Sequence, residues 1–408
     1  AEPEPVEYVR VCDVYGAGFF YIPGTETCLR IGGEARVQIG ASNDEDPFSW
    51  ADFYAGGPFG TDTPNLHGHE ADTWNVESRG RFYLDARSQT EWGTLRGYIR
   101  VDASRGGFGV ANSANNIRTN KAFVELGGFK VGFEDSAWAF TPNAGAANYG
   151  THSDSGLMYG YQQRNLIQYN FSGSNGFFAT LSLEDDNRNQ VTPTFVWDAA
   201  AGAYAPAVPG YADNNYVPDI VAKVGVNQAW GAAWAAIGYD EDRTNAFTTL
   251  AAAALADPDL LGDSGWAGQL GVHLNVPSAP GSSFRLIGYY ADSDNLFNPL
   301  TGTGLATWGD GVGVYGGPEW SILASYHHQF NAQFGASIAV QWFNDFYFAN
   351  SDVSTGLDGW ALELAAVWQP VRDFVVRTEV IYSDFDTDPL SGADGDSVGG
   401  FVRFSRFF

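Results

Sequence analysis

The chain alternates apolar and polar residues over many short segments. Residues 29–39 are a clear case, with Ile31 and Ile39 on one side of the alternation and Arg30 and Arg36 on the other. A period of two places successive side chains on opposite faces of a β-strand. The pattern therefore predicts strands that have one apolar face and one charged face.

This alternation recurs from one end of the sequence to the other. Most of the segments approach the roughly nine to eleven residues that a tilted strand needs to cross the hydrocarbon of a bilayer. Their number is even, as in bacterial barrels. The sixteen predicted strands are 29–39, 79–87, 95–102, 121–126, 129–134, 164–171, 177–184, 220–227, 232–240, 268–276, 284–290, 320–330, 334–343, 360–369, 374–384 and 401–408.

The connections alternate strictly between short turns and long stretches rich in Asp, Asn and Gly. This order places every long loop at the same end of the sheet. A soluble β-sandwich does not require such an arrangement. A barrel with short periplasmic turns and long external loops has this arrangement. The long stretches are 41–78, 103–120, 135–163, 185–218, 241–266, 291–318, 344–359 and 385–399.

A sheet of this size with one apolar face cannot remain open in water. Closure removes its edges and pairs every backbone hydrogen bond, as lipid requires. The charged face then lines a wide aqueous lumen. No run of about eighteen apolar residues is present, which excludes a helical membrane span. We therefore predict an all-β fold, a 16-stranded antiparallel transmembrane β-barrel, and its 50 glycines and 15% aromatic residues agree with strands and turns.

The formal charge of −27 excludes a nucleic-acid binder, because phosphate contacts come chiefly from Lys and Arg. The acidic loops form either a solvated, repulsive surface or a region that gathers cations at a pore mouth. No catalytic residues, metal ligands or cofactor are expected, since no Ser–His–acid arrangement is evident and Asp384, Asp386 and Asp388 fail as an EF-hand, with Pro389 at the turn. A looser loop-bound Ca²⁺ stays open.

The two cysteines, Cys12 and Cys28, have no metal-ligand spacing. One disulfide that closes a loop of about fifteen residues is the simplest interpretation, with a stabilisation of ~3 kcal/mol. It indicates an oxidising compartment such as the periplasm. We expect residues 1–28 to form a disulfide-closed periplasmic segment and 29–408 the barrel, with a signal peptide already removed ahead of Ala1.

Three segments of the sequence are distinctive: 7–13 (EYVRVCD), 15–30 (YGAGFFYIPGTETCLR) and 401–408 (FVRFSRFF), with Val131-Gly132 as an internal anchor. On these residues, and most strongly at its N-terminus, the sequence resembles the general porins of alphaproteobacteria. The resemblance implies a homotrimer in the outer membrane of a Gram-negative bacterium, in contact with lipid and lipopolysaccharide. It also implies passive diffusion of small hydrophilic solutes and ions, and a third external loop, 135–163, that folds into the barrel and narrows the pore.

Basic residues cluster on the predicted polar faces of the first strands. We expect them to face acidic residues of the third loop, Glu134, Asp135 and Asp154, so that a transverse field crosses the narrowest point. The predicted basic pore wall comprises Arg30, Arg36, Arg79, Arg81, Arg87, Arg96, Arg100, Lys121 and Lys130.

Two alternatives remain open at this point. The arginines can instead pair with carboxylates on neighbouring strands and neutralise a polar wall, the partners being Glu34, Asp85, Asp102 and Glu125. The charge balance favours a weakly cation-selective diffusion channel rather than an enzyme. The alternative is a substrate-selective channel for sugars or phosphate esters, with Trp138 and loop tyrosines as a stacking track.

Overall fold

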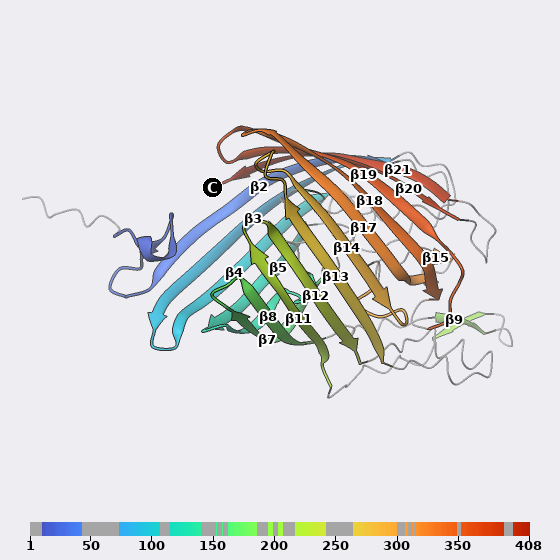
Figure 1. Cartoon of the computed structure of the whole chain (residues 1–408), viewed down its shortest axis with the longest axis horizontal. Helices are drawn as coiled ribbons and strands as arrows, with labels where there is room; N and C mark the ends of the chain where they lie inside the picture. The colour runs from blue at the N-terminus through green and yellow to red at the C-terminus, as the bar shows by residue number, and fades with distance from the viewer. Residues whose placement is uncertain are drawn as a thin grey trace, which may run out of the picture.

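Sixteen antiparallel strands close into a barrel in the computed structural model of the chain (Figure 1). The structure describes residues 10–42, 73–106, 115–139, 152, 157, 162–185, 195–198, 203–206, 217–241, 264–299, 307–308, 312–313, 315–348, 352–386 and 395–408. The barrel strands are β2 (Cys28–Ser42), β3 (Thr73–Thr90), β4 (Gly93–Gly106), β5 (Asn115–Leu126), β6 (Phe129–Asp135), β7 (Gln163–Ser172), β8 (Phe177–Glu184), β11 (Asp219–Gln228), β12 (Gly231–Asp240), β13 (Gly265–Asn275), β14 (Ser283–Ala291), β17 (Tyr315–Asn331), β18 (Phe334–Phe348), β19 (Gly359–Val371), β20 (Phe374–Phe385) and β21 (Gly395–Phe407).

Each barrel strand pairs with its neighbours along the chain, and β21 pairs with β2 to close the ring. The seam runs in register from Glu34 opposite Phe407 to Ser42 opposite Gly399. The predicted fold class is confirmed, and every predicted segment overlaps one strand. Several strands extend further toward the long loops than predicted; β3, for example, begins at Thr73 rather than at residue 79.

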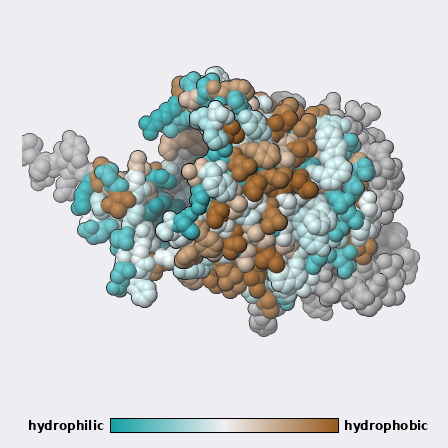
Figure 2. Space-filling model, viewed as in Figure 1, coloured by the Kyte–Doolittle hydropathy of each residue, from teal (hydrophilic) through white to brown (hydrophobic). Residues whose placement is uncertain are grey.

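The two faces of the barrel wall are inverted relative to a soluble protein. Outward aliphatic side chains are exposed, such as Ile99 at 49% and Leu270 at 68%, whereas inward Arg36 and Asp102 are almost fully buried. Figure 2 shows the apolar residues as a broad band over the middle of the face in view. Within the described ranges, no helix has the length and hydropathy to cross a membrane. The outer band is the surface that lipid would cover.

The two ends of the barrel differ in their connections. Gly127 and Gly128 alone join β5 to β6, with φ of +56° and +94°. Two positive φ values give a turn whose twist matches the flanking strands, and glycine adopts them without strain. We call this the short-turn end. At the other, long-loop end lie the short hairpins β9–β10 (Phe195–Asp198, Ala203–Pro206) and β15–β16 (Thr307–Trp308, Val312–Gly313).

A small disulfide-closed segment precedes the barrel. It holds the 3₁₀ turn η1 (Asp13–Tyr15) and β1 (Phe20–Tyr21), which pairs with the first residues of β2. The Cys12–Cys28 disulfide forms as predicted and packs with Phe19 into a core of its own. This segment lies at the opposite end of the barrel from β9 and β15 (Figure 1).

Candidate functional site

The inward side chains of β2–β6, which we call the charged wall, form ion pairs between adjacent strands. Arg36 donates to Glu77 at 3.1 Å, and both are buried. Arg81 binds Asp102 through two hydrogen bonds of 2.7 and 2.8 Å. Arg79 lies 3.8 Å from Asp102 and links this pair to Glu34. The antiparallel register dictates these pairs, since it places Arg81 directly opposite both Glu34 and Asp102.

Nearer the short-turn end, one carboxylate serves two arginines. Asp85 accepts hydrogen bonds from Arg87 at 2.7 and 2.9 Å and from Arg96 at 3.0 and 3.1 Å. Arg96 also lies 3.7 Å from Glu125. Asp85 is fully buried, and bonds of this charge-assisted kind are the strong ones. Its two arginines are therefore held rigidly against the wall.

A row of aromatic rings, Tyr83, Tyr98 and Phe123, lies beside these arginines. Neighbouring ring centroids are 6.0 and 5.3 Å apart, with nearly parallel planes. The Arg96 guanidinium lies 5.0 Å from the Tyr98 centroid, and Arg30 lies 5.4 Å from that of Tyr83. Such cation–π contacts fix the cations over the ring faces. We call this set the aromatic row.

Two predicted pore acids lie on the charged wall rather than opposite it. Glu134 and Asp135 belong to β6, not to the loop, and both bind Lys121 at 2.5 Å. Lys130 lies 3.4 Å from Glu134. The prediction that these two acids face the arginines is corrected here: the strand continues through them and places them next to the lysine of β5. The third predicted acid, Asp154, lies outside the described residues.

The pairing alternative fits the charged wall. Glu34, Asp85, Asp102 and Glu125 each contact an arginine of a neighbouring strand or of their own, as that interpretation requires. Arg100 differs, because it donates to the Asn120 amide oxygen. The nine predicted basic residues share this wall with seven carboxylates: Glu34, Glu77, Asp85, Asp102, Glu125, Glu134 and Asp135. The acidic excess of the chain therefore lies elsewhere.

The opposite part of the inner surface holds a closely packed apolar cluster, with buried polar side chains beside it. We call the inward residues of β11–β14 and β17–β20 the packed wall. Trp138 of the third loop is completely buried there, with ring centroids 5.3 Å from Phe297 and 6.5 Å from Tyr289. Leu157, farther along the loop, belongs to the same cluster. The wall side of this cluster is made of Val221, Ala232, Trp234, Ala236, Ala267, Ile287, Ala291, Leu323, Ala339, Phe343, Phe346, Leu357, Ala361, Ile381 and Phe385.

Polar contacts hold the start of the third loop against this wall. The Ala137 amide donates to Glu184 at 2.9 Å, and the Lys223 ammonium donates to the Ala137 carbonyl at 2.6 Å. The prediction that the third loop folds into the lumen is confirmed. One detail is corrected: Trp138 is fully buried, so it offers no surface on which a passing solute could stack.

A second attachment of the loop was not predicted. His152 is 1% exposed and shares hydrogen bonds with Ser325 at 2.6 Å and with Ser283 at 2.9 Å. Its amide donates to Ser337 at 3.2 Å. The signal in the sequence was faint: serines at inward positions of strands that otherwise bury apolar side chains.

Metal ligands are not brought together in the part of the chain that the structure describes, where no group of three His, Cys, Asp or Glu side chains could hold an ion. Asp292, a carboxylate in the long stretch 291–318, accepts a hydrogen bond from the Trp266 amide at 2.8 Å. His327 and His328 are consecutive residues and face opposite sides of β17. A loop-bound Ca²⁺ stays a prediction.

Comparisons with known proteins agree with this geometry. The sequence model of the family described as "Porin subfamily" matches residues 1–399. Porin Omp2b of Brucella suis is 33% identical over 247 residues, which is 59% of this chain and 59% of that protein. The match thus spans less than two thirds of this relative.

Two solved structures share the fold. The outer membrane channel DcaP of Acinetobacter baumannii superposes with a TM-score of 0.62 at 14% identity, covering 95% of this chain and 99% of that one. An anion-selective porin from Comamonas acidovorans gives 0.53 at 9% identity, covering 94% and 100%.

Proposed function

The chain belongs to the porin subfamily, and from this premise we propose that it forms a water-filled channel for passive diffusion of small hydrophilic solutes and ions. It is an outer-membrane protein of a Gram-negative bacterium. The observation that carries the proposal is the inverted wall, which exposes Ile99 and Leu270 outside and sequesters Arg36 and Asp102 inside. A barrel with such a wall is suited to lipid around its outer surface and water in its lumen.

We expect the channel to prefer cations over anions weakly. The nine predicted basic residues already outnumber the seven carboxylates of the charged wall, so this wall does not favour cations by itself. The net charge of −27 must then act from other parts of the chain, above all from the Asp-rich loop sequences. Loop charges that stand in bulk solution are screened by salt within about 10 Å at 0.1 M. Cation preference should therefore fade as the salt concentration rises.

We also propose that the channel is a homotrimer that contacts membrane lipid and lipopolysaccharide. The family resemblance of the N-terminal segment supports the trimer. The third loop would narrow the bore from the packed wall, where Trp138 and Leu157 are buried.

Planar-bilayer recording tests the channel. Purified protein in a KCl gradient should give stepwise conductance increases and a reversal potential of the sign for cation preference, larger at 0.1 M than at 1 M salt. A sealed barrel, with no steps at any salt concentration, would refute the proposal. A preference that stays constant with salt would place the selecting charges inside the bore instead.

A second candidate is a substrate-selective channel for sugars or phosphate esters. The aromatic row favours it, because half-buried Tyr83 and Tyr98 lie next to Arg30 and Arg96 on the inner wall. Rings beside arginines suit a sugar ring that carries a phosphate. Glucose 6-phosphate should then reduce the current in a saturable manner, and glucose should do so more weakly. A current that is insensitive to both leaves the diffusion channel as the function.

A further inference from the structure

Arg30, near the short-turn end of the charged wall, is held by aromatic rings instead of by a carboxylate. Its guanidinium lies 5.2 Å from the ring centroid of Phe19 and 5.4 Å from that of Tyr83. Within the described ranges, no carboxylate oxygen lies within 4.0 Å of this guanidinium, and its buried Nε donates no hydrogen bond. Arg30 thus carries a positive charge that is not paired with an acid in the described chain.

The carboxylate opposite Arg30 is already occupied. Asp85 lies directly across from Arg30 in the pairing of β2 with β3. Both of its oxygens, however, accept hydrogen bonds from Arg87 and from Arg96. Glu125 is engaged as well, because it lies 3.7 Å from Arg96. Three arginines therefore share two carboxylates at this place, which leaves one positive charge in excess.

The disulfide-closed segment forms one side of the position of Arg30. A Cβ added to Gly18 would lie 3.5 Å from the Cδ of Arg30, so the backbone of the segment lies close to this side chain. The next residue, Phe19, is buried and supplies the ring. The Cys12–Cys28 disulfide joins the segment to the first residue of β2, two residues before Arg30. The segment therefore helps to fix the guanidinium in place.

The barrel forms the other side through Tyr83. A Cβ added to Gly32 of β2 would overlap the Tyr83 phenol, so glycine at this position gives the ring room to lie across the strand. Tyr98 and Phe123 continue the aromatic row from there, at 6.0 and 5.3 Å. Tyr83 and Tyr98 are partly exposed. A solute at Arg30 therefore has an aromatic surface beside it.

A guanidinium held between rings keeps its hydrogen-bond donors for another partner. Cation–π contacts act on the face of the ion and use none of its five N–H groups. The two terminal nitrogens of Arg30 are accessible, and within the described ranges they bind no other group. Phosphate and carboxylate oxygens match this planar fork in a bidentate manner. An oxyanion would thus gain charge-assisted hydrogen bonds without breaking an ion pair.

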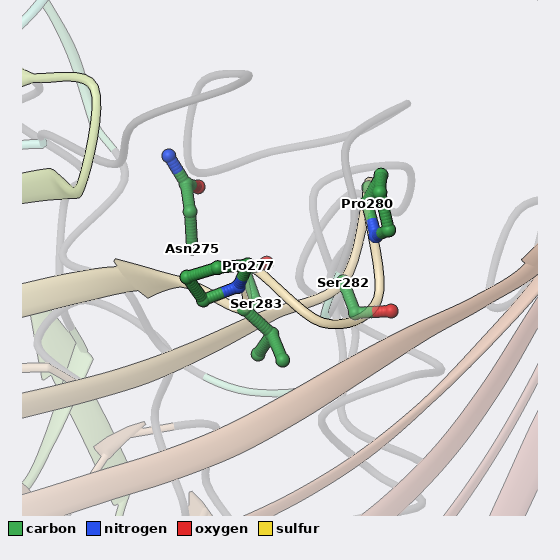
Figure 3. A pocket seen from close by; sticks show the side chains of 7 residues that line it. Asn275, Pro277, Pro280, Ser282 and Ser283 are labelled. Carbon is green, nitrogen blue, oxygen red and sulfur yellow. The ribbon is translucent and has the colours of Figure 1, made fainter.

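A second hollow at the short-turn end lacks such a group. The turn between β13 and β14 surrounds a pocket of about 350 Å³. Figure 3 shows this turn, with Asn275, Pro277, Pro280, Ser282 and Ser283 around the pocket. None of its seven lining residues is charged. The excess charge, rather than space alone, therefore distinguishes the position of Arg30.

We propose that Arg30 binds the oxyanion group of a solute at the short-turn end of the channel, and that Phe19 of the disulfide-closed segment completes the site. The ligand is a small ring compound with one phosphate or carboxylate group, and its ring lies on Tyr83. The inference rests on the proposed function, since it concerns a solute that passes through the lumen. It gives the N-terminal segment a part in solute recognition.

Current block in planar bilayers tests the site. Recording at about 0.1 M KCl limits screening of the charges. Glucose 6-phosphate, glucuronate and glucose present similar rings with a phosphate, a carboxylate and no charge. Both anions should block the unaltered channel saturably, and glucose should block it more weakly. Block by one anion alone would also support the site and would identify the group that it takes.

Arg30→Gln removes the charge and should raise the half-blocking concentration of the anions about tenfold, the loss expected for a charge-assisted hydrogen bond. The value for glucose should not change. Arg372→Gln is the matched control, because this arginine lies in the turn between β19 and β20 at the same end and its side chain is 94% exposed. It should leave every half-blocking concentration unchanged.

Phe19→Leu tests the contribution of the segment. Leucine keeps an apolar side chain in the small core around the disulfide but removes the ring, so the anion values should rise about threefold. This variant also serves if Arg30→Gln does not insert. Absence of block by both anions, equally strong block by glucose, or anion block that neither variant weakens overturns the proposal. None of these results alters the conductance in KCl alone, which tests the proposed channel separately.

Discussion

The charged wall and the packed wall face each other across one lumen, yet different physics stabilises them. The charged wall is a lattice of ion pairs, most of which join adjacent strands as Arg81–Asp102 does. The packed wall buries Trp138 and Leu157 of the third loop against apolar strand residues. Only the packed wall carries a described part of the loop. Among the described residues, loop attachment is therefore confined to the packed wall, whereas charge is not, since the packed wall also holds the Arg377–Glu379 ion pair.

Removing the aromatic anchor should produce the largest effect. Trp138→Ala deletes a fully buried indole, and changes of this kind cost about 3–5 kcal/mol in a packed core. The strand ladder does not depend on Trp138, so the cost falls on docking of the loop. Current noise should rise strongly while ion selectivity stays constant. Trp92→Ala, at a turn residue that is 75% exposed, is the control. If the current noise of Trp138→Ala equals that of the unaltered protein, packing of the Trp138 indole is not what holds the loop.

Removing charge from the other wall should have a moderate effect of a different kind. Replacing both Arg81 and Arg100 by Ser takes two positive charges from the inner surface. The cation-to-anion permeability ratio should rise by about twofold, as when a charged ring in a pore is altered. Reversal potentials in a KCl gradient measure it. Glu34→Gln should shift the ratio the opposite way, and noise should not change in either variant. An unchanged ratio would show that ion selection takes place elsewhere.

Opening the N-terminal disulfide should have the smallest effect on the channel. The segment rests on the charged wall, with Arg30 and Arg87 within 5.2 and 5.0 Å of the Phe19 ring. Replacing Cys12 and Cys28 by Ser removes ~3 kcal/mol of constraint from this segment alone. Limited proteolysis should cut it faster, with conductance unaltered. A changed conductance would mean that the segment helps to shape the charged wall.

The strands could be predicted from the sequence because alternation is a local property. Residues 29–39 reveal their two faces without reference to any other segment, and the same holds for each strand. The pairing of Asp85 with Arg87 and Arg96 was also within reach, because adjacent antiparallel strands bring such residues together. The family resemblance supplied the third loop, which the alternation alone could not.

The attachment of that loop could not be predicted. His152 meets Ser283 and Ser337, which follow it by 131 and 185 residues, and no local pattern encodes such a meeting. We expected Glu134 and Asp135 at the entry of the third loop, with the strand ending at residue 134. The structure extends β6 by one residue to Asp135, and both acids bind Lys121 on the neighbouring strand β5.

The seam between β2 and β21 has a consequence for how the molecule is assembled. Arg403 donates to Gln38 across it at 2.8 Å, over a separation of 365 residues. Contacts of such long range make folding slow, because most of the chain must be ordered before they can form. Until then both strands present unpaired edges that invite aggregation. The polypeptide must therefore be kept from aggregating with other copies of itself between synthesis and insertion. Once the barrel closes, both edges are paired and this protection is no longer needed.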